Sequence, residues 1–293
     1  MTLNENALPV HAALLPFLGV LRIGGADAAR FLQGQLTNDV QLLADGRTQL
    51  TACNTPQGRV IALLRLHQGE DAIYALLPTE MLERVSALLR RYVLRSRVEL
   101  QIAADLQVGW TRAMTASPGA AATHKVAFDY APGRQVVAVP HDAWRSMSGL
   151  PSTLPRPRIQ DAWLAADIAD GLPQVFAATS AAFVPQMLNL DLLDAISFTK
   201  GCYTGQEIVA RTQNLGRIKR RTLRYRLAAG AAPPPLAGLH RDGTRVAEVL
   251  MSAEHDGAVE LLAVTNLDAA GQALTLEDGR IAEPQELPYR TGG

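Results

Sequence analysis

Cysteine is scarce in this sequence of 293 residues, which holds only Cys53 and Cys202. Two cysteines so far apart exclude a disulfide framework and a cysteine-rich metal site, and they suit a reducing compartment. The formal net charge is zero, so no overall field directs the chain toward nucleic acid or a membrane. No stretch approaches the roughly 20 apolar residues of a membrane span, and the N-terminus lacks a basic signal region. We therefore expect a cytoplasmic protein with no membrane partner.

Familiar catalytic motifs are also lacking. The sequence contains no G-x-S-x-G elbow, no H-E-x-x-H, no C-x-x-C and no phosphate-binding loop. Its six histidines are scattered without the spacing of metal ligands, so no metal site is predicted. Gly24 and Gly25, followed by Gly34, do not match a dinucleotide-binding fingerprint.

The composition that is present, 48% apolar and 19% charged, is typical of a globular protein with two or three subdomains. In the first third of the chain, apolar patterns alternate between strand and helix. Asp27 and Thr79 are placed to cap the two helices. The expected order is a strand at 17–23, a helix after Asp27, a hairpin at 47–66, a strand at 71–77, a helix from Thr79 and a strand at 97–102. This order predicts an α+β domain with a largely antiparallel sheet.

The remaining two thirds divide into three kinds of pattern. Short strands are expected at 107–112, 125–130 and 134–140, with a small-residue loop at 115–124 between the first two and a proline-rich connector at 149–158 after them. Helices are expected at 163–169 and 188–197. From Thr222 onward apolar and polar residues alternate with period two, which predicts a small C-terminal β-barrel.

One stretch, KGCYTGQEIVAR at 200–211, combines more functional side chains than ordinary strands and helices need. Glycines at 201 and 205 allow the backbone to approach a ligand or another chain closely. Lys200 lies two residues from Cys202 and would favour its thiolate, the nucleophilic form. The alternative is that Cys202 is a small, buried and inert side chain. The candidate residues of this motif are Lys200, Gly201, Cys202, Tyr203, Gly205, Gln206, Glu207 and Arg211.

This stretch resembles the signature of the YgfZ family of folate-binding proteins, whose mitochondrial relatives are iron–sulfur assembly factors. GADAARFLQGQLTNDV at 25–40 and FVPQMLNLDLLDAISFTKGCYTGQE at 183–207 resemble other family segments, as does ADGLPQV at 169–175. The resemblance covers most of 17–220. It implies the tripartite fold of the glycine-cleavage aminomethyltransferase (GcvT), an α+β fold with antiparallel sheets and a C-terminal β-barrel. Its cofactor would be tetrahydrofolate or a derivative.

Four subdomains follow from the patterns and the resemblance together. Residues 1–104 would form an N-terminal α+β folate-binding subdomain, and residues 105–155 a middle subdomain. Residues 156–220 would form a return segment that carries the KGCYTGQE motif. Residues 221–293 would form the C-terminal β-barrel.

The resemblance also implies where folate would bind. Trp163 falls where a pocket tryptophan of the family is expected, whereas Phe17 and Leu18 stand where a second one is expected. Gln35, Asn38 and Asp39 would lie on the pocket rim. The alternatives are that Trp163 belongs to the core and that the polar residues close a helix terminus.

One departure from the related fold concerns chemistry. Aminomethyltransferases of this fold carry an acidic pair on the strand after the first hairpin turn. The matching strand here holds Ala62 and Leu63, which cannot shuttle a proton. We therefore expect the pocket to be kept and the transfer reaction to be lost or replaced, so the protein is not expected to be a conventional enzyme.

Three functions are considered. The first is a tetrahydrofolate-binding accessory protein that supports iron–sulfur cluster assembly or repair, for example in radical enzymes that modify tRNA, with Cys202 as the key thiol and iron–sulfur client or assembly proteins as partners. The second is a folate-dependent one-carbon (aminomethyl) transferase, against which the missing acids count. The third is an RNA-associated module, because seven cations and no acid lie between Arg211 and Arg226, and five arginines lie between Arg84 and Arg97. Alternating arginines on a solvent face are the favoured explanation, and a polyglutamate folate tail or an acidic partner protein would suit the same charges, so nucleic acid is not the expected partner.

Overall fold

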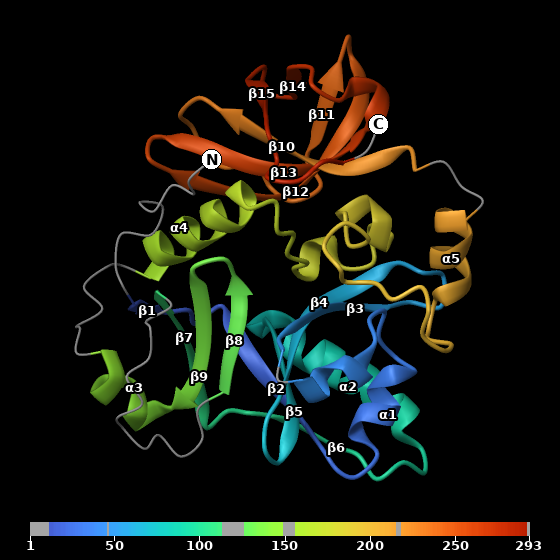
Figure 1. Ribbon diagram of the computed structural model, residues 1–293. Coiled ribbons are helices and arrows are strands. Elements are labelled where there is room, and N and C mark those ends of the chain that lie inside the picture. The colour runs from blue at the N-terminus through green and yellow to red at the C-terminus, as the bar shows by residue number, and fades with distance from the viewer. Residues whose placement is uncertain (1–11, 46, 113–125, 149–155, 215–217, 292–293) are drawn as a thin grey trace.

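The computed structural model describes residues 12–45, 47–112, 126–148, 156–214 and 218–291. Figure 1 shows two sheets side by side at one end, a barrel at the other, and a helical segment between them. The loop at 115–124 and the connector at 149–155 that the sequence analysis considered lie outside the described residues. No helix within these ranges is both long and apolar enough to cross a membrane.

A five-stranded antiparallel sheet forms the first layer, with the strand order β3-β4-β5-β2-β6. Its strands confirm the predicted alternation and are β2 (Leu18–Gly24), β3 (Gln49–Asn54), β4 (Val60–Gln68), β5 (Ala72–Pro78) and β6 (Glu99–Ile102). Helices α1 (Ala28–Gln33) and α2 (Leu82–Val93) cover one face of this sheet. Neither predicted cap is formed by a side chain. Asp27 instead pairs with Arg97, and the Thr79 hydroxyl donates to the carbonyl of Pro16.

A four-stranded antiparallel sheet packs against the other face, in the order β1-β7-β9-β8. It contains β1 (Ala12–Leu14), β7 (Leu106–Arg112), β8 (Val126–Ala131) and β9 (Arg134–Pro140), followed by α3 (His141–Ser148). The short strand β1 pairs with β7, so the N-terminal part of the chain contributes to this second sheet. The subdomain boundaries at 104, 155 and 220 stay a prediction.

The return segment begins with α4 (Arg156–Ala169) and ends with α5 (Gln206–Asn214). The predicted helix at 188–197 is wrong. Asn189 and Asp194 there have φ values of 58° and 51°, which no right-handed helix accepts. The Asn189 side chain instead donates a 2.8 Å bond to the Thr222 carbonyl of the barrel. Side-chain bonds to distant backbone thus replace helical bonds in this stretch.

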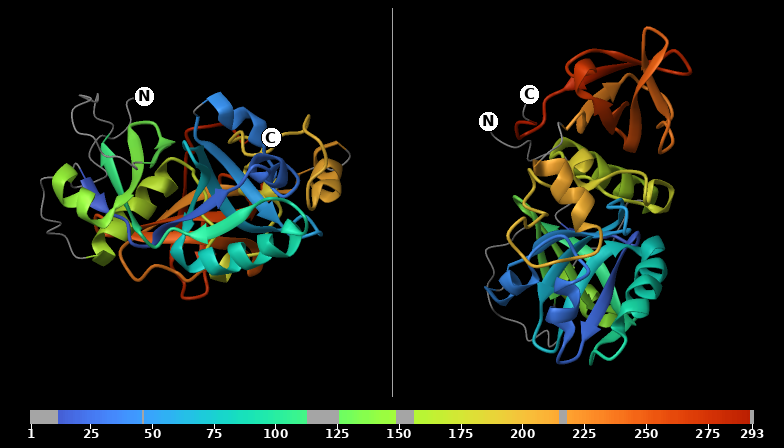
Figure 2. Two further views of the ribbon diagram at one scale, coloured as in Figure 1. Left: turned by 90° about the horizontal axis from the view of Figure 1, so that it is seen from below. Right: turned by 90° about the vertical axis from the view of Figure 1, so that its right-hand side faces the viewer.

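The C-terminal barrel is closed, as the period-two pattern predicted, in the order β10-β13-β12-β11-β14-β15. Its strands are β10 (Arg220–Leu227), β11 (Gly238–Arg241), β12 (Thr244–His255), β13 (Ala258–Asn266), β14 (Leu274–Leu276) and β15 (Ile281–Gln285). Figure 2 shows the barrel stacked on the return segment, which separates it from the two sheets. A shared apolar core of β4, α4, α5, β12 and β13 joins these layers.

Candidate functional site

The KGCYTGQEIVAR motif is divided into a loop, residues 200–205, and the first part of α5. The loop lies against the turn between β3 and β4. Gly205, at the end of the loop, has a φ of 81°. A Cβ atom at Gly205 would come within 2.5 Å of the Thr55 carbonyl oxygen and 2.9 Å of the Gly58 Cα. Only glycine fits this contact, so Gly205 fixes the loop against the hairpin.

Lys200 holds the loop from inside. Its side chain is buried, and its Nζ donates to the carbonyl oxygens of Leu36 and Asn38 at 2.8 and 2.6 Å. Burial lowers the Lys200 pKa to about 8, although the nearby carboxylate of Asp39 opposes this shift. The ammonium therefore points into the segment after α1, and its role beside the thiol of Cys202 stays a prediction.

The predicted rim residues lie in that same segment, so the structure brings them together with the motif. Gln35 accepts a 3.4 Å bond from the Thr204 hydroxyl. The Asn38 amide donates to the carbonyls of Leu50 and Asp194 at 2.9 and 2.5 Å, and the Asp39 carboxylate accepts from Gln33. These bonds link the segment after α1 to β3 and to the return segment. Their role toward a ligand stays a prediction.

The reactive side chains of the motif face outward. Cys202 is exposed, and Glu207 and Arg211 form an ion pair of 3.1 Å on the solvent side of α5. Tyr203 is buried next to Cys202, and its backbone N–H donates to Gln206 at the start of α5. By contrast, Cys53 is buried in the core between the five-stranded sheet and helices α1 and α2, and burial raises the pKa of its thiol to about 12. Of the two thiols, Cys202 is therefore the one that can react with another molecule.

Trp163 lies elsewhere, in the core between the two sheets and α4. It is 0% exposed, and its ring packs 4.9 Å from Tyr130 and 6.1 Å from Trp110. The guanidinium of Arg134 lies 4.7 Å from the centre of its indole ring. In this arrangement Trp163 is a core residue in its packing, and its contact with a folate stays a prediction.

A buried group of charged and polar side chains surrounds Trp163. Asp167 of α4 accepts a 2.9 Å hydrogen bond from the Tyr130 hydroxyl and pairs with Arg134 at 2.9 Å. Arg134 also pairs with Asp170 at 2.6 Å, and the Arg65 guanidinium stacks 3.5 Å from the Tyr130 ring centre. Burial raises the Asp167 pKa, while Arg134 and Arg65 oppose that rise.

Apart from Nη1 of Arg134 and Oδ1 of Asp167, which form an ion pair with each other, three polar atoms of this cluster are buried and have no hydrogen-bond partner among the described residues. They are Nη2 of Arg65, Nε1 of Trp163 and Oε1 of Gln174. Unsatisfied buried polar atoms are rare, and each calls for a water or a ligand. Sequence reasoning named Trp163 and missed the rest. The sequence signal that points to this buried cluster is Arg65, a charged residue within the apolar run VIALLRL of β4.

The remaining predicted residues lie in the apolar cores of the molecule. Phe17 is half-buried and packs against the core around Trp163 and against the core of α4 and α5. Ala62 and Leu63 of β4 are both buried, and Leu63 lies in the same core as Leu164 of α4. No hydrogen bond, ion pair or ring contact joins Cys202 to Trp163 in the described part of the chain. Cys202 is exposed, whereas Trp163 is fully enclosed in the core.

The basic run between Arg211 and Arg226 is largely neutralised. Arg211, Arg220, Arg221, Arg224 and Arg226 each pair with a carboxylate, and the Arg221–Asp191 pair is buried. The described arginines of this run therefore already have carboxylate partners within the chain. Within the described ranges, no three side chains of histidine, cysteine, aspartate or glutamate gather as a metal site would require.

Comparison with known proteins gives relatives of matching length. No protein-family profile matches the sequence. The tRNA-modifying protein YgfZ of Hamiltonella defensa is 31% identical over 300 residues, which cover 91% of this chain and 86% of that protein. The tRNA-modifying protein YgfZ of Yersinia pestis is 31% identical over 314 residues, which cover 97% of this chain and 94% of that protein.

Among solved structures, aminomethyltransferase T of the glycine cleavage system from Bartonella henselae superposes on this chain with a TM-score of 0.74. The match covers 97% of this chain and 88% of that one at 15% sequence identity. At this identity the similarity concerns the fold alone. The predicted fold, α+β with antiparallel sheets and a C-terminal barrel in the GcvT-like arrangement, is confirmed.

Proposed function

Because the chain belongs to the family of tRNA-modifying proteins YgfZ, we propose that it binds a reduced folate and supports the modification of tRNA. In finer terms, it acts as an accessory protein in the assembly or repair of iron–sulfur clusters in tRNA-modifying enzymes. The observation that carries this proposal is the exposed thiol of Cys202 on a loop that buried residues hold in place.

Cys202 acts on a partner and holds no cluster of its own. An iron–sulfur cluster normally takes four thiolate ligands, and this chain offers one accessible thiol. A single exposed thiol can still exchange with a cysteine or a sulfur species of a second protein. Fixing the loop at Lys200 and Gly205 presents the sulfur in one position, which lowers the cost of forming such a complex.

The cluster around Trp163 has the chemistry to hold a pterin. A reduced pterin presents a carbonyl, ring nitrogens and an amino group along one edge, and needs donors and an acceptor opposite them. Arg65 and Trp163 supply two free donors and Gln174 one free acceptor. A bound folate supplies a one-carbon carrier. Because Trp163 is fully buried, its contacts with Tyr130 and Trp110 must separate for a ligand to enter.

Aminomethyl transfer is not proposed. The strand β4 offers Ala62 and Leu63 where that reaction needs an acid, and both side chains are buried. Lys200, a buried titratable group of the motif, is bonded to two backbone carbonyls. Folate is therefore proposed as a bound regulator or carrier, without a transfer step on this chain.

The thiol is tested in cells of a bacterium deleted for its own YgfZ relative. The deletion strain is complemented with the wild-type gene, with Cys202→Ala or with Cys53→Ala, and thiolated tRNA nucleosides are quantified by mass spectrometry. Wild type and Cys53→Ala should restore modification, whereas Cys202→Ala should not. Full restoration by Cys202→Ala would show that the thiol has no role.

Folate binding is tested separately by anaerobic calorimetry with tetrahydrofolate. Wild type and Trp144→Phe should bind, and Trp163→Phe, which keeps the aromatic packing but lacks Nε1, should bind more weakly by roughly tenfold because one charged or polar ligand contact is lost. Equal binding by Trp163→Phe would move the site away from the cluster. No binding by wild type would remove folate from the proposal and leave the thiol result intact.

A further inference from the structure

Helix α2 and the turn that follows it carry a concentration of unpaired positive charge. Five arginines and no acidic residue lie between 84 and 98. Arg97 pairs with Asp27, and Arg90 donates to the Leu100 carbonyl. The side chains of Arg84, Arg91 and Arg95 are exposed and have no hydrogen bond or ion pair within the described residues. This differs from the basic run of the barrel, whose described arginines are largely paired.

Two of these arginines share one face of the helix. Leu82, Val85, Ser86 and Leu89 form the buried side of α2. Arg84 and Arg91 are seven residues apart, so they project from the opposite side, about 10 Å apart along the axis. Arg95 follows the C-cap residue Leu94, in the turn after the helix.

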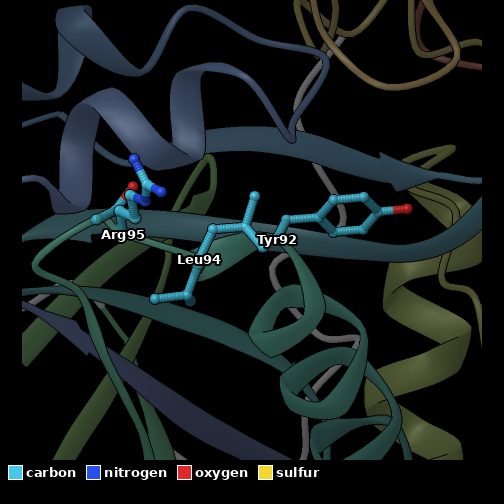
Figure 3. Close-up of a pocket in the computed structure, with 5 residues that line it drawn as sticks. Tyr92, Leu94 and Arg95 are labelled. Carbon is cyan, nitrogen blue, oxygen red and sulfur yellow. The ribbon is translucent and has the colours of Figure 1, made fainter.

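An exposed apolar side chain lies beside this charge. Leu94 is 88% exposed, more than any other large apolar residue of the described chain, and Tyr92 is 39% exposed. Leu94 also has a φ of 44° and a ψ of −104°, a backbone conformation that a leucine adopts only at a cost. Tyr92, Val93, Leu94, Arg95 and Ser96 line an open hollow of about 600 Å³. Figure 3 shows Leu94 between the side chains of Tyr92 and Arg95.

We propose that the exposed face of α2 and the turn after it, defined by Arg84, Arg91, Tyr92, Leu94 and Arg95 and called here the α2 patch, form a docking surface for an acidic segment of a partner protein that carries an apolar anchor. Guanidinium groups recognise carboxylates through paired hydrogen bonds, which accounts for the unpaired arginines. An apolar anchor surrounded by charge is the arrangement of a protein–protein contact.

The apolar component distinguishes this partner from a single-stranded nucleic acid. Single-stranded RNA binds through aromatic stacking platforms alternating with cations. The α2 patch offers one partly exposed tyrosine, and its most exposed group is an aliphatic leucine that cannot stack on a base. The patch lies on the helix that covers the outer face of the five-stranded sheet, and it contains no residue of the motif or of the Trp163 cluster. It is therefore independent of the proposed function.

The test uses a short fluorescein-labelled peptide rich in glutamate, with leucines at helical spacing, and measures its affinity by fluorescence anisotropy at physiological salt. A matched peptide with glutamine in place of glutamate and a labelled oligouridylate are the other probes. Wild type should bind the acidic peptide, and the glutamine peptide and the RNA should bind at least tenfold more weakly. The double variant Arg91→Glu/Arg95→Glu should lose about tenfold or more in peptide affinity, while Arg290→Glu, an exposed arginine far along the chain, should not.

Leu94→Gly gives a second readout that misfolding cannot mimic. Glycine accepts the positive φ at position 94, so this variant should be more stable than wild type and yet bind the acidic peptide several-fold more weakly. Peptide affinity unchanged in both variants would overturn the proposal. Preferential binding of the oligouridylate, lost in Arg91→Glu/Arg95→Glu, would overturn it in favour of an RNA site.

Discussion

The motif loop and the cluster around Trp163 use buried polar groups in opposite ways. In the cluster, Asp167, Arg134 and Arg65 face one another inside the molecule, and the charges compensate each other. In the loop, the buried Lys200 bonds to backbone carbonyls and leaves Cys202 free on the surface. In the cluster, the charged groups therefore interact with one another inside the core. In the loop, the buried residues hold one exposed sulfur atom in position.

The largest effect is expected at Asp167. Asp167→Ala leaves Arg134 and Arg65 buried with less compensating charge, which should lower the free energy of unfolding by about 3–5 kcal/mol. Urea denaturation measures the change. Glu207→Ala, which removes the carboxylate of the exposed pair with Arg211, should cost at most about 0.5 kcal/mol. Similar losses in the two variants would contradict the contrast between a closed cluster and an open loop.

Next in size is the glycine that seats the loop. Gly205→Ala puts a methyl group against the Thr55 carbonyl at a positive φ, and should cost about 2–3 kcal/mol in the free energy of unfolding. Gly201→Ala is the matched control, because a Cβ there meets no atom within 4 Å. It should change stability by less than about 0.5 kcal/mol. The idea that Gly205 seats the loop fails if Gly205→Ala is as stable as Gly201→Ala.

A pH dependence should follow from Lys200. Its pKa is about 8 in the folded protein and 10.5 in the unfolded chain, so between these values the unfolded chain binds more protons. The contribution of Lys200 to stability therefore rises from pH 8 to pH 10.5, by about 2 kcal/mol after allowance for partial solvent exposure. Thermal denaturation across this range should show the rise in wild type and in Lys219→Met, and not in Lys200→Met. If the stability of Lys200→Met rose with pH in parallel with that of wild type, the lowered pKa of Lys200 would be contradicted.

The smallest effect on stability is expected at the reactive residue itself. Cys202→Ser changes an exposed side chain and should alter the free energy of unfolding by less than about 0.5 kcal/mol. Cys53→Ser buries a hydroxyl in the core between the five-stranded sheet and helices α1 and α2 and should cost about 1–3 kcal/mol. Chemical denaturation of both variants compares the two thiols. A marked loss of stability in Cys202→Ser would give that residue a structural role.

Local pattern was sufficient for most of the fold. Short apolar runs bounded by turn residues predicted most strands of the two sheets, and period-two alternation predicted the barrel, because a half-buried strand alternates its side chains. Strand β1 was not predicted. The motif by itself also points to the family. Patterns failed where distant bonds compete with local ones, as at Asn189, whose side chain reaches the barrel. The helix α5 was missed because the polar residues of the motif hide its apolar spacing.

The sequence by itself therefore determined most of the strands, the barrel and the family, and it singled out Cys202 as the candidate thiol. Only the tertiary structure decided that Cys202 is exposed, that Lys200 bonds to the segment after α1, and that Arg65, Asp167 and Trp163 share one buried place. The physical reason is the separation along the chain over which each effect acts. Alternation and turn chemistry act between residues a few positions apart, whereas burial and charge pairing depend on segments that are distant in the sequence and meet only when the layers pack.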